Sequence, residues 1–270
     1  MTVLSMILVD SHCHLDRLKT DDEHSLAGYL SEAGQQNVAH LLCVAINLEA
    51  WPAMCKQVEA YAQVSLSVGV HPSEYEGEDP TVERLVSLAN SDPRVVAIGE
   101  TGLDYHYGEG EQLDLQRQRF RRHIQAAREV GKPLIVHTRD AREDTIAILR
   151  EEGAERVGGV MHCFTESWEM AEQALELGFY ISFSGIVTFK NADSLREVAR
   201  RVPQERLLIE TDSPYLAPVP MRGKPNQPAY VRYVAEKIAE VRGDSLEQVA
   251  AYSTANFFRL FSEARQRRAA

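Results

Sequence analysis

Cysteine is scarce in this 270-residue chain, and the four that occur follow no paired spacing. Cys13, Cys43, Cys55 and Cys163 form no CxxC unit, which indicates reduced thiols and no disulfide scaffold. Long apolar runs are also absent, and the short run before residue 10 lacks a basic region and a cleavage site. These absences exclude a disulfide-stabilised or membrane-spanning protein and predict a cytoplasmic one.

Positive charge is in deficit, because 29 lysines and arginines oppose 40 aspartates and glutamates, for a net charge of −11. Since Lys and Arg supply most of the non-specific affinity of proteins for nucleic acids, this balance excludes a broad cationic track along DNA. It leaves open a phosphate-containing substrate, because bound cations can reverse the local sign of charge in a site.

A glycine-rich phosphate loop after an early strand is a third absence, and it bears on the fold. Apolar, β-branched runs followed by turn residues recur at intervals near the roughly 30 residues of a strand–helix–strand unit. These eight runs are Met6–Val9, His40–Ile46, Val64–Val70, Val95–Ile98, Pro133–Val136, Gly158–Met161, Phe179–Phe183 and Leu207–Ile209. Apolar strands that alternate with helices indicate a covered parallel sheet. Since a doubly wound sheet would need the missing loop, we predict a closed (β/α)8 TIM barrel.

Amphipathic segments occupy the intervals between the predicted strands. Helices are expected at Asp114–Val130, Ala141–Glu151, Trp168–Leu177 and Pro228–Val241. Three of these apolar stripes end at a glycine, as helices commonly do. No low-complexity linker interrupts the alternation, so residues 1–270 are predicted to form a single TIM-barrel domain.

Histidine is unevenly placed, since five of the nine histidines lie at the predicted carboxyl ends of strands. His12 and His14 follow the first strand, and side chains two residues apart in a strand point to one face. The carboxyl ends of parallel barrel strands meet at one mouth, where such enzymes keep their active sites. Imidazoles and carboxylates suit divalent metals, so we predict a metal centre made by His12, His14, Glu100, His137, His162 and Asp212.

Six ligands exceed what a tetrahedral ion with an open position requires. They suit two divalent ions bridged by the centrally placed Glu100. Two ions about 3.5–4 Å apart can activate a water and hold the attacking and leaving oxygens of a phosphoryl displacement. Asp212, at the last strand, is expected to accept the proton from that water. Histidine-rich ligation favours zinc, manganese or iron over magnesium in affinity, but metal availability can override this preference.

Substrate phosphates need positively charged or hydrogen-bonding partners. The candidates at the predicted mouth are His71, Arg139, Lys190, Arg222 and Lys224. Glu210 shares a strand face with Asp212 and is expected to orient a metal ligand. Cys13 and Cys163 adjoin ligand histidines, but neighbouring strand residues point to opposite faces. Both thiols are therefore expected to point away from the metals.

Six motifs spread over most of the chain resemble those of the TatD family of metal-dependent hydrolases. They are Val9-Asp-Ser-His-Cys-His14, Ser67-Val-Gly-Val-His-Pro72, Gly99-Glu-Thr-Gly-Leu-Asp-Tyr105, Ile135-Val-His-Thr-Arg139, His162-Cys-Phe-Thr165 and Glu210-Thr-Asp-Ser-Pro-Tyr-Leu216. The resemblance implies an amidohydrolase-like (β/α)8 barrel with two metals. One ion would lie among His12, His14, Glu100 and Asp212, and the other among Glu100, His137 and His162. It further implies that Mg²⁺ or Mn²⁺ supports deoxyribonuclease activity of 3′-to-5′ exonuclease character.

The predicted site residues allow three functions to be compared. The first is a phosphodiesterase that trims DNA. Short single-stranded ends are the expected substrate, because a protein with a net charge of −11 is expected to bind DNA only through the metals and a few cations near the scissile phosphate. The alternative is hydrolysis of a carboxylic ester or amide at the same two-metal site. Related barrels with that activity frequently carry a carboxylated lysine at strand 4, where this chain has Glu100. Metal storage or a scaffold is disfavoured because neither needs an open mouth, and no obligate protein partner is indicated.

Overall fold

The computed structural model describes residues 6–22 and 24–264. The predicted domain spans 1–270, so residues 1–5, 23 and 265–270 of that prediction lie outside the described residues. The extent of the domain therefore stays a prediction. Among the described residues, no helix combines the length and the apolar character needed to cross a bilayer.

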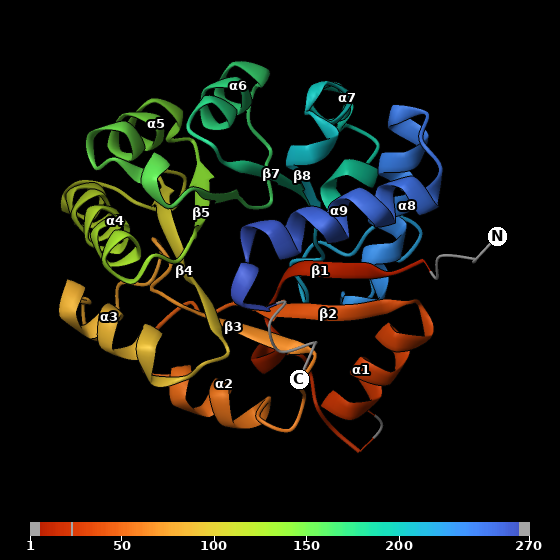
Figure 1. The fold of residues 1–270 in the computed structure, drawn as a ribbon, viewed down its shortest axis with the longest axis horizontal. Helices are drawn as coiled ribbons and strands as arrows, with labels where there is room; N and C mark the ends of the chain where they lie inside the picture. The colour runs from red at the N-terminus through yellow and green to blue at the C-terminus, as the bar shows by residue number, and fades with distance from the viewer. Residues whose placement is uncertain (1–5, 23, 265–270) are drawn as a thin grey trace.

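The described residues contain an eight-stranded parallel sheet whose strands follow one another in chain order (Figure 1). The strands are β1 (Leu8–Cys13), β2 (Val38–Cys43), β3 (Val64–Val68), β4 (Val95–Asp104), β5 (Leu134–Arg139), β6 (Gly159–Met161), β7 (Tyr180–Phe183) and β8 (Leu207–Ile209). Beyond the end of β8, Asp212 N donates to His12 O over 2.9 Å and His14 N donates to Ser213 O over 2.8 Å. These bonds bring the chain after β8 back to β1, and the predicted (β/α)8 barrel is confirmed.

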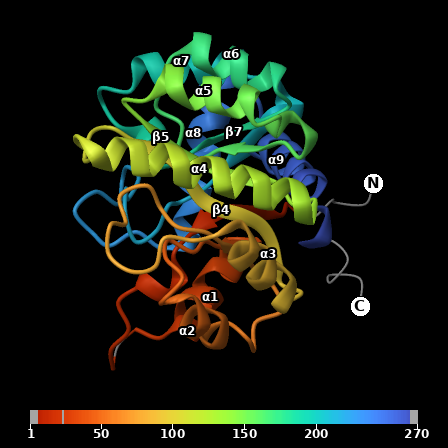
Figure 2. The same cartoon turned by 90° about the vertical axis from the view of Figure 1, so that its left-hand side faces the viewer.

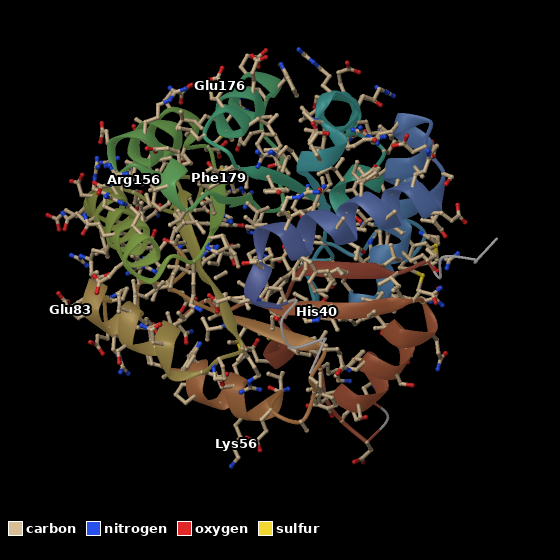
Figure 3. All side chains as sticks on the ribbon, in the orientation of Figure 1. His40, Lys56, Glu83, Arg156, Glu176 and Phe179 are labelled. Atoms are coloured by element: carbon tan, nitrogen blue, oxygen red, sulfur yellow. The ribbon has the colours of Figure 1, made fainter. Side chains whose placement is uncertain are left out.

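Helices surround the sheet on its outside (Figure 1). They are α1 (Leu26–Gln35), α2 (Trp51–Gln57), α3 (Val82–Ser91), α4 (Glu111–Val130), α5 (Arg142–Glu151), α6 (Trp168–Glu176), α7 (Asp193–Arg201), α8 (Val231–Arg242) and α9 (Leu246–Leu260). Short 3-10 segments are η1 (Leu15–Arg17), η2 (Ala154–Arg156), η3 (Gly185–Thr188), η4 (Gln204–Arg206) and η5 (Pro228–Tyr230). Figure 3 shows Lys56, Glu83 and Glu176 on the outer helices with their side chains directed outward, as expected of a solvated face.

One end of the barrel is closed by apolar packing. The interior residues Val9, Leu42, Ile135, Val160 and Leu208 form one buried cluster with Phe257 of α9 and Phe261, which directly follows this helix. Thr254 Oγ1 donates to Ile7 O over 2.8 Å, and Asn256 Nδ2 donates to Leu207 O over 2.9 Å. These bonds fix α9 beside the beginnings of β1 and β8. Figure 2 shows α9 on the side opposite the loops that follow β3 and β8. The open mouth therefore lies at the carboxyl ends of the strands.

The predicted strands all occur, and seven of the eight differ from their predicted bounds, three of them most clearly. The first strand runs over Leu8–Cys13 and not Met6–Val9, and the second over Val38–Cys43 and not His40–Ile46. β4 continues six residues past the predicted end at Ile98, because Gly102 to Asp104 pair with His137 to Arg139 of β5. The last predicted helix begins as η5 at Pro228, and α8 starts at Val231. The remaining predicted helices differ by three residues or fewer at each end.

Candidate metal centre

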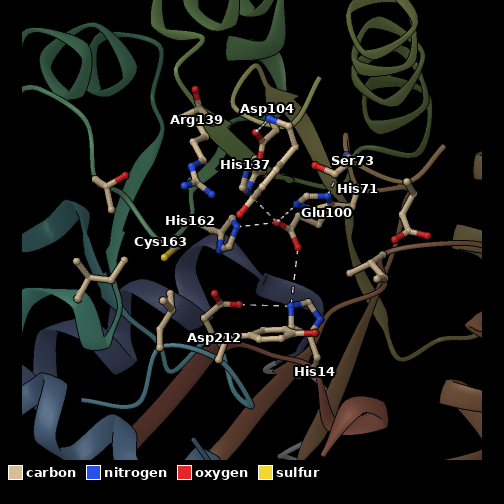
Figure 4. Close-up of a pocket in the computed structure, with 18 of the residues that line it drawn as sticks. His14, His71, Ser73, Glu100, Asp104, His137, Arg139, His162, Cys163 and Asp212 are labelled. Atoms are coloured by element: carbon tan, nitrogen blue, oxygen red, sulfur yellow. Dashed lines mark hydrogen bonds and ion pairs between the residues drawn. The ribbon is translucent and has the colours of Figure 1, made fainter. Parts of the chain in front are cut away.

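A cavity of about 680 Å³ opens at the carboxyl ends of the strands (Figure 4). Three predicted residues that line it, His137, His162 and Asp212, come from β5 and from the segments after β6 and β8. His137 and His162 follow Ile135 and Val160 by two residues, so the alternation that points those apolar side chains inward directs both imidazoles into the mouth.

Glu100 of β4 lies at the centre of the histidines, with its two oxygens turned to different groups (Figure 4). Its Oε1 lies 2.7 Å from His162 Nε2 and 3.3 Å from His137 Nδ1. Its Oε2 lies 3.4 Å from His12 Nε2 and 3.9 Å from His14 Nε2. A carboxylate placed in this way can bridge two cations, one on each side.

The residue before Glu100 has to be glycine. Gly99 adopts φ +143°, a conformation that side chains disfavour. A Cβ atom at this position would also lie 2.6 Å from the carbonyl oxygen of Ile135 in the neighbouring strand. This close approach of β4 and β5 brings the Glu100 carboxylate next to His137.

The first ligand group consists of His12, His14 and Asp212. The Nε2 atoms of His12 and His14 are 3.3 Å apart, and Asp212 Oδ1 lies 3.4 Å from the latter nitrogen. Nδ1 of His14 lies 2.9 Å from the carbonyl oxygen of Val44, to which it must donate, so Nε2 of the neutral ring carries a lone pair. Lone pairs and carboxylates that converge in this way fit a divalent cation.

The second ligand group consists of His137 and His162 with Glu100, and each imidazole has a carboxylate behind it. Asp104 Oδ2 lies 3.0 Å from His137 Nε2, and Glu210 Oε1 lies 3.1 Å from His162 Nδ1. Such carboxylates fix the ring orientation and the tautomer of a metal-binding histidine. The orienting position of Glu210 was predicted from the sequence, whereas that of Asp104 was not, although Asp104 shares the strand parity of Glu100.

The electrostatic balance of the centre favours a cation. Burial raises the pKa of Glu100, but the charges of His162 and His71 and the hydrogen bonds from His12 and His137 outweigh it, and the pKa lies well below its usual range. For Asp212 the effect of burial is likewise outweighed, chiefly by the hydrogen bond with His14, so its pKa is also lowered. Burial lowers the pKa of His162, yet Glu100 and Glu210 raise it well above its usual range. Two ionised, largely buried carboxylates therefore face these rings.

His71 also reaches the centre, with Nε2 3.4 Å from Glu100 Oε1. Its Nδ1 accepts a hydrogen bond from the backbone N–H of Ser73 over 3.1 Å. The neutral ring therefore carries its proton on Nε2 and has no free lone pair for a metal. Although His71 is close enough to Glu100 and His137 to share an ion with them, its hydrogen bonding supports a role as a donor to substrate.

The predicted cationic substrate contacts separate into two sets. Arg139, at the end of β5, lines the cavity, whereas Lys190, Arg222 and Lys224 are exposed and do not line it. Arg222 instead places its guanidinium 4.1 Å from the centre of the Phe189 ring and donates to Ala217 O. All three lie in loops that follow β7 or β8, on the carboxyl side of the barrel as predicted, and their contact with substrate stays a prediction. Strand order gives the end of the barrel from which a loop leaves, but not the direction of side chains within a long loop.

Arg17 lines the cavity and was not selected from the sequence. It belongs to η1, directly after the strand that carries His12 and His14. Its position three residues after His14 could have indicated from the sequence that Arg17 lies near the mouth. The cavity thus has two guanidinium groups, Arg17 and Arg139, in the same lining as the clustered histidines and carboxylates.

Cys163 differs from its predicted orientation, because it lines the cavity. β6 ends at Met161, and Cys163 has a φ of +43°, so strand alternation no longer applies there. Its Sγ lies 3.1 Å from Ser184 Oγ, and burial raises the pKa of the thiol well above its usual range. Cys13, in contrast, lies in the apolar core as predicted.

Comparison with known proteins gives the same family over nearly the whole chain. Residues 9–262 match the family described as TatD related DNase. The chain is 54% identical to the uncharacterized metal-dependent hydrolase YcfH of Escherichia coli K12, over 95% of this chain and 96% of that protein. It is 43% identical to the uncharacterized metal-dependent hydrolase YabD of Bacillus subtilis, over 94% and 99% of the two chains.

A solved structure has the same architecture. The crystal structure of YJJV, a TatD homolog from Escherichia coli, superposes with a TM-score of 0.87 at 28% identity, over 94% of this chain and 98% of that one. Family motifs, relatives and fold agree with the clustered histidines and carboxylates at the barrel mouth. This chain belongs to the TatD family of metal-dependent hydrolases.

Proposed function

We propose that this protein is a deoxyribonuclease that hydrolyses phosphodiester bonds at single-stranded DNA ends, with 3′-to-5′ exonuclease character. The observation that carries the proposal is the position of Glu100 between two groups of metal-binding side chains in an open cavity. The description of the family as TatD related DNase supports a DNA substrate.

Two divalent cations are proposed as cofactors, with Mg²⁺, Mn²⁺ and Zn²⁺ as the candidates. His12, His14 and Asp212 would hold one, His137 and His162 the other, and Glu100 would bridge them. When bound, the cations would supply an activated water and stabilise the negative charge that develops at the phosphate. These residues suit divalent cations because histidine lone pairs and ionised carboxylates converge in the cavity.

Four side chains that line the cavity have proposed roles in proton transfer or in substrate binding. Asp212, whose lowered pKa keeps it ionised, is placed to accept a proton from the attacking water. His71 carries its proton on Nε2 and is placed to donate to a phosphate oxygen. The Arg139 and Arg17 guanidinium groups would balance substrate charge at the two sides of the cavity.

Single-stranded ends are favoured by the charge of the protein. With a net charge of −11 and two arginines lining the cavity, contacts with phosphate are limited to those near the scissile bond. A long duplex held along its backbone would need more cationic contacts. The cytoplasmic location predicted from the sequence is part of this proposal, and the four free cysteines are compatible with it.

The test is parallel hydrolysis of single strands labelled at the 5′ or 3′ end, of duplexes, and of carboxylic ester and amide substrates by the metal-loaded protein. The metal content should be measured on the same preparation. We expect stepwise shortening from the 3′ end and little acyl hydrolysis, with loss of activity in Glu100→Gln. Preferred turnover of acyl substrates would instead assign the alternative ester or amide hydrolase function.

A further inference from the structure

Large hydrophobic side chains are rarely exposed in this fold, and two that are belong to the functional cavity. Among the described residues, three such side chains are exposed, namely Tyr107 (63%), Tyr215 (48%) and Val219 (48%). Tyr107 and Tyr215 line the cavity that contains Glu100, whereas Val219 does not. Exposed aromatic surface beside a polar site indicates binding of a flat apolar group.

The two tyrosines stand on opposite sides of the mouth. Tyr107 belongs to the connection between β4 and α4, and Tyr215 to the connection between β8 and α8. In a ring of eight strands arranged in chain order, β4 and β8 are four strands apart in either direction, as Figure 1 shows. A ligand bound at Glu100 therefore has one aromatic ring on each side.

Tyr107 is held by the same residues that organise the cavity. Its backbone N–H donates to Asp104 Oδ1 over 3.1 Å, and the other oxygen of Asp104 contacts His137. The guanidinium of Arg139 lies 4.9 Å from the centre of the Tyr107 ring, a cation–π contact that covers part of the ring and orients Arg139. The His106 ring also meets that of Tyr107 edge-on, with centroids 4.8 Å apart, and Tyr107 remains 63% exposed.

Tyr215 is held in an equally defined position. Its backbone N–H donates to Asp212 O over 2.9 Å, and its carbonyl accepts from Asn226 Nδ2 over 2.5 Å. Its ring meets that of His14 with centroids 6.1 Å apart at an angle of 66°. Tyr215 thus lies next to residues assigned to a metal, Tyr107 lies next to the Asp104 and Arg139 side chains, and neither ring is packed away in the core.

We propose that Tyr107 and Tyr215 are base-stacking subsites for the two nucleotides on either side of the scissile phosphate. The inference rests on the proposed deoxyribonuclease function. It adds which side chains bind the bases of the DNA substrate. Stacking accepts every base, because each has a π face, and it requires bases that are free of a duplex. A chain with few cationic contacts can bind single strands by such stacking.

The test is a double-mutant cycle between tyrosine and base, using the metal-loaded full-length protein. Tyr107→Ala, Tyr215→Ala and the control Val219→Ala are assayed on oligonucleotides with a normal or an abasic residue on either side of the cleaved bond. We expect each tyrosine variant to lose about 10-fold in kcat/KM on the normal substrate, mainly through KM, and to lose little when the matching base is absent. Tyr107→Phe and Tyr215→Phe retain a ring and should keep near-normal activity.

Two outcomes would overturn the inference. One is an equal loss on normal and abasic substrates, and the other is a phenylalanine variant as impaired as the alanine variant. Binding of a non-hydrolysable phosphonate-linked oligonucleotide, measured by fluorescence anisotropy, separates this inference from the proposed function. Base-dependent binding that needs the tyrosines, without any cleavage of the normal strand, would reject the nuclease and retain the stacking sites. Binding that ignores both bases and tyrosines would reject the stacking sites.

Discussion

Glu210 Oε1 lies 3.1 Å from His162 Nδ1, while the opposite nitrogen of that imidazole lies 2.7 Å from Glu100 Oε1. Glu210 is fully buried, and it follows Leu208 on the interior face of the last strand. The histidine is therefore held between a carboxylate that faces the cavity and one that is behind it. A carboxylate in the rear position makes the ring a better metal ligand.

Glu210→Gln is expected to weaken metal binding at the His137–His162 side by about 10- to 100-fold while the fold is kept. The neutral amide still accepts a hydrogen bond, but it no longer increases the basicity of His162. Isothermal titration with Mn²⁺ and Zn²⁺ measures the change. Glu236→Gln on α8, an exposed glutamate paired with Arg232, is the matched control and should bind metals as the wild type does. Unchanged affinity in Glu210→Gln would reject the orienting role.

Residues next to the strand ends were predictable from the sequence because strand order brings all eight carboxyl ends to one mouth. His12, His14, Glu100, His137, His162 and Asp212 all converge in the structure, although their role as metal ligands stays a prediction. Residues inside loops were not predictable. The orientation of Arg222 depends on its contact with the Phe189 ring, and that of Cys163 depends on its positive φ. Neither feature produces a periodic pattern in the sequence.

Gly99→Ala should lower the thermal stability and abolish turnover, because the added methyl group would lie 2.6 Å from Ile135 O and the φ of +143° disfavours a side chain. The loss is expected to be at least about 1–3 kcal/mol in the free energy of unfolding, measured by urea denaturation. Gly34→Ala in α1 is the control, because no atom beyond its chain neighbours and its own helix backbone lies within 4 Å of the position that a Cβ atom would take. That variant should be unchanged or more stable, since alanine favours a helix. Equal stability of the two variants would contradict the steric argument.

His71→Asn should lower kcat by about 100-fold without loss of bound metal, as removal of one hydrogen-bond donor to the reacting group does in other enzymes. The reason is that Nδ1 of His71 accepts from Ser73 N, which leaves its proton on Nε2. Metal content per chain and steady-state rates on a labelled single strand are the two measurements. His137→Asn is the comparison, and it should lose metal as well as activity. A drop in metal content in His71→Asn would show that His71 is a ligand.

His123 of α4 should make the fold sensitive to acid. Burial lowers its pKa to about 4, and the neutral ring accepts from Val70 N over 3.0 Å while its Nδ1 donates to Arg119 O over 2.8 Å. Because the folded-state pKa lies below the unfolded-state value near 6.5, protons bind the unfolded chain preferentially. Stability from neutral His123 is thus complete above pH 6.5 and is lost as the pH falls towards 4.

His123→Gln keeps an acceptor for Val70 N but does not titrate. Between pH 7 and pH 5, the wild type should lose about 2 kcal/mol more unfolding free energy than this variant, measured by urea denaturation. All other titrating groups are common to the two proteins, so the difference reports His123. Parallel pH profiles would contradict the prediction.

The salt dependence of DNA cleavage should be shallow. Each phosphate neutralised by a protein cation contributes a slope of about −0.7 for single strands, so Arg17 and Arg139 together predict about −1.4 in a plot of log(kcat/KM) against log salt concentration at constant divalent metal. Arg139→Gln should reduce the magnitude of this slope by about 0.7. Lys56→Gln on α2 is the control, because Lys56 is exposed on the outside of the barrel and does not line the cavity, and its slope should match the wild type. A wild-type slope equivalent to six or more phosphate contacts would show that a cationic track outside the cavity holds the strand.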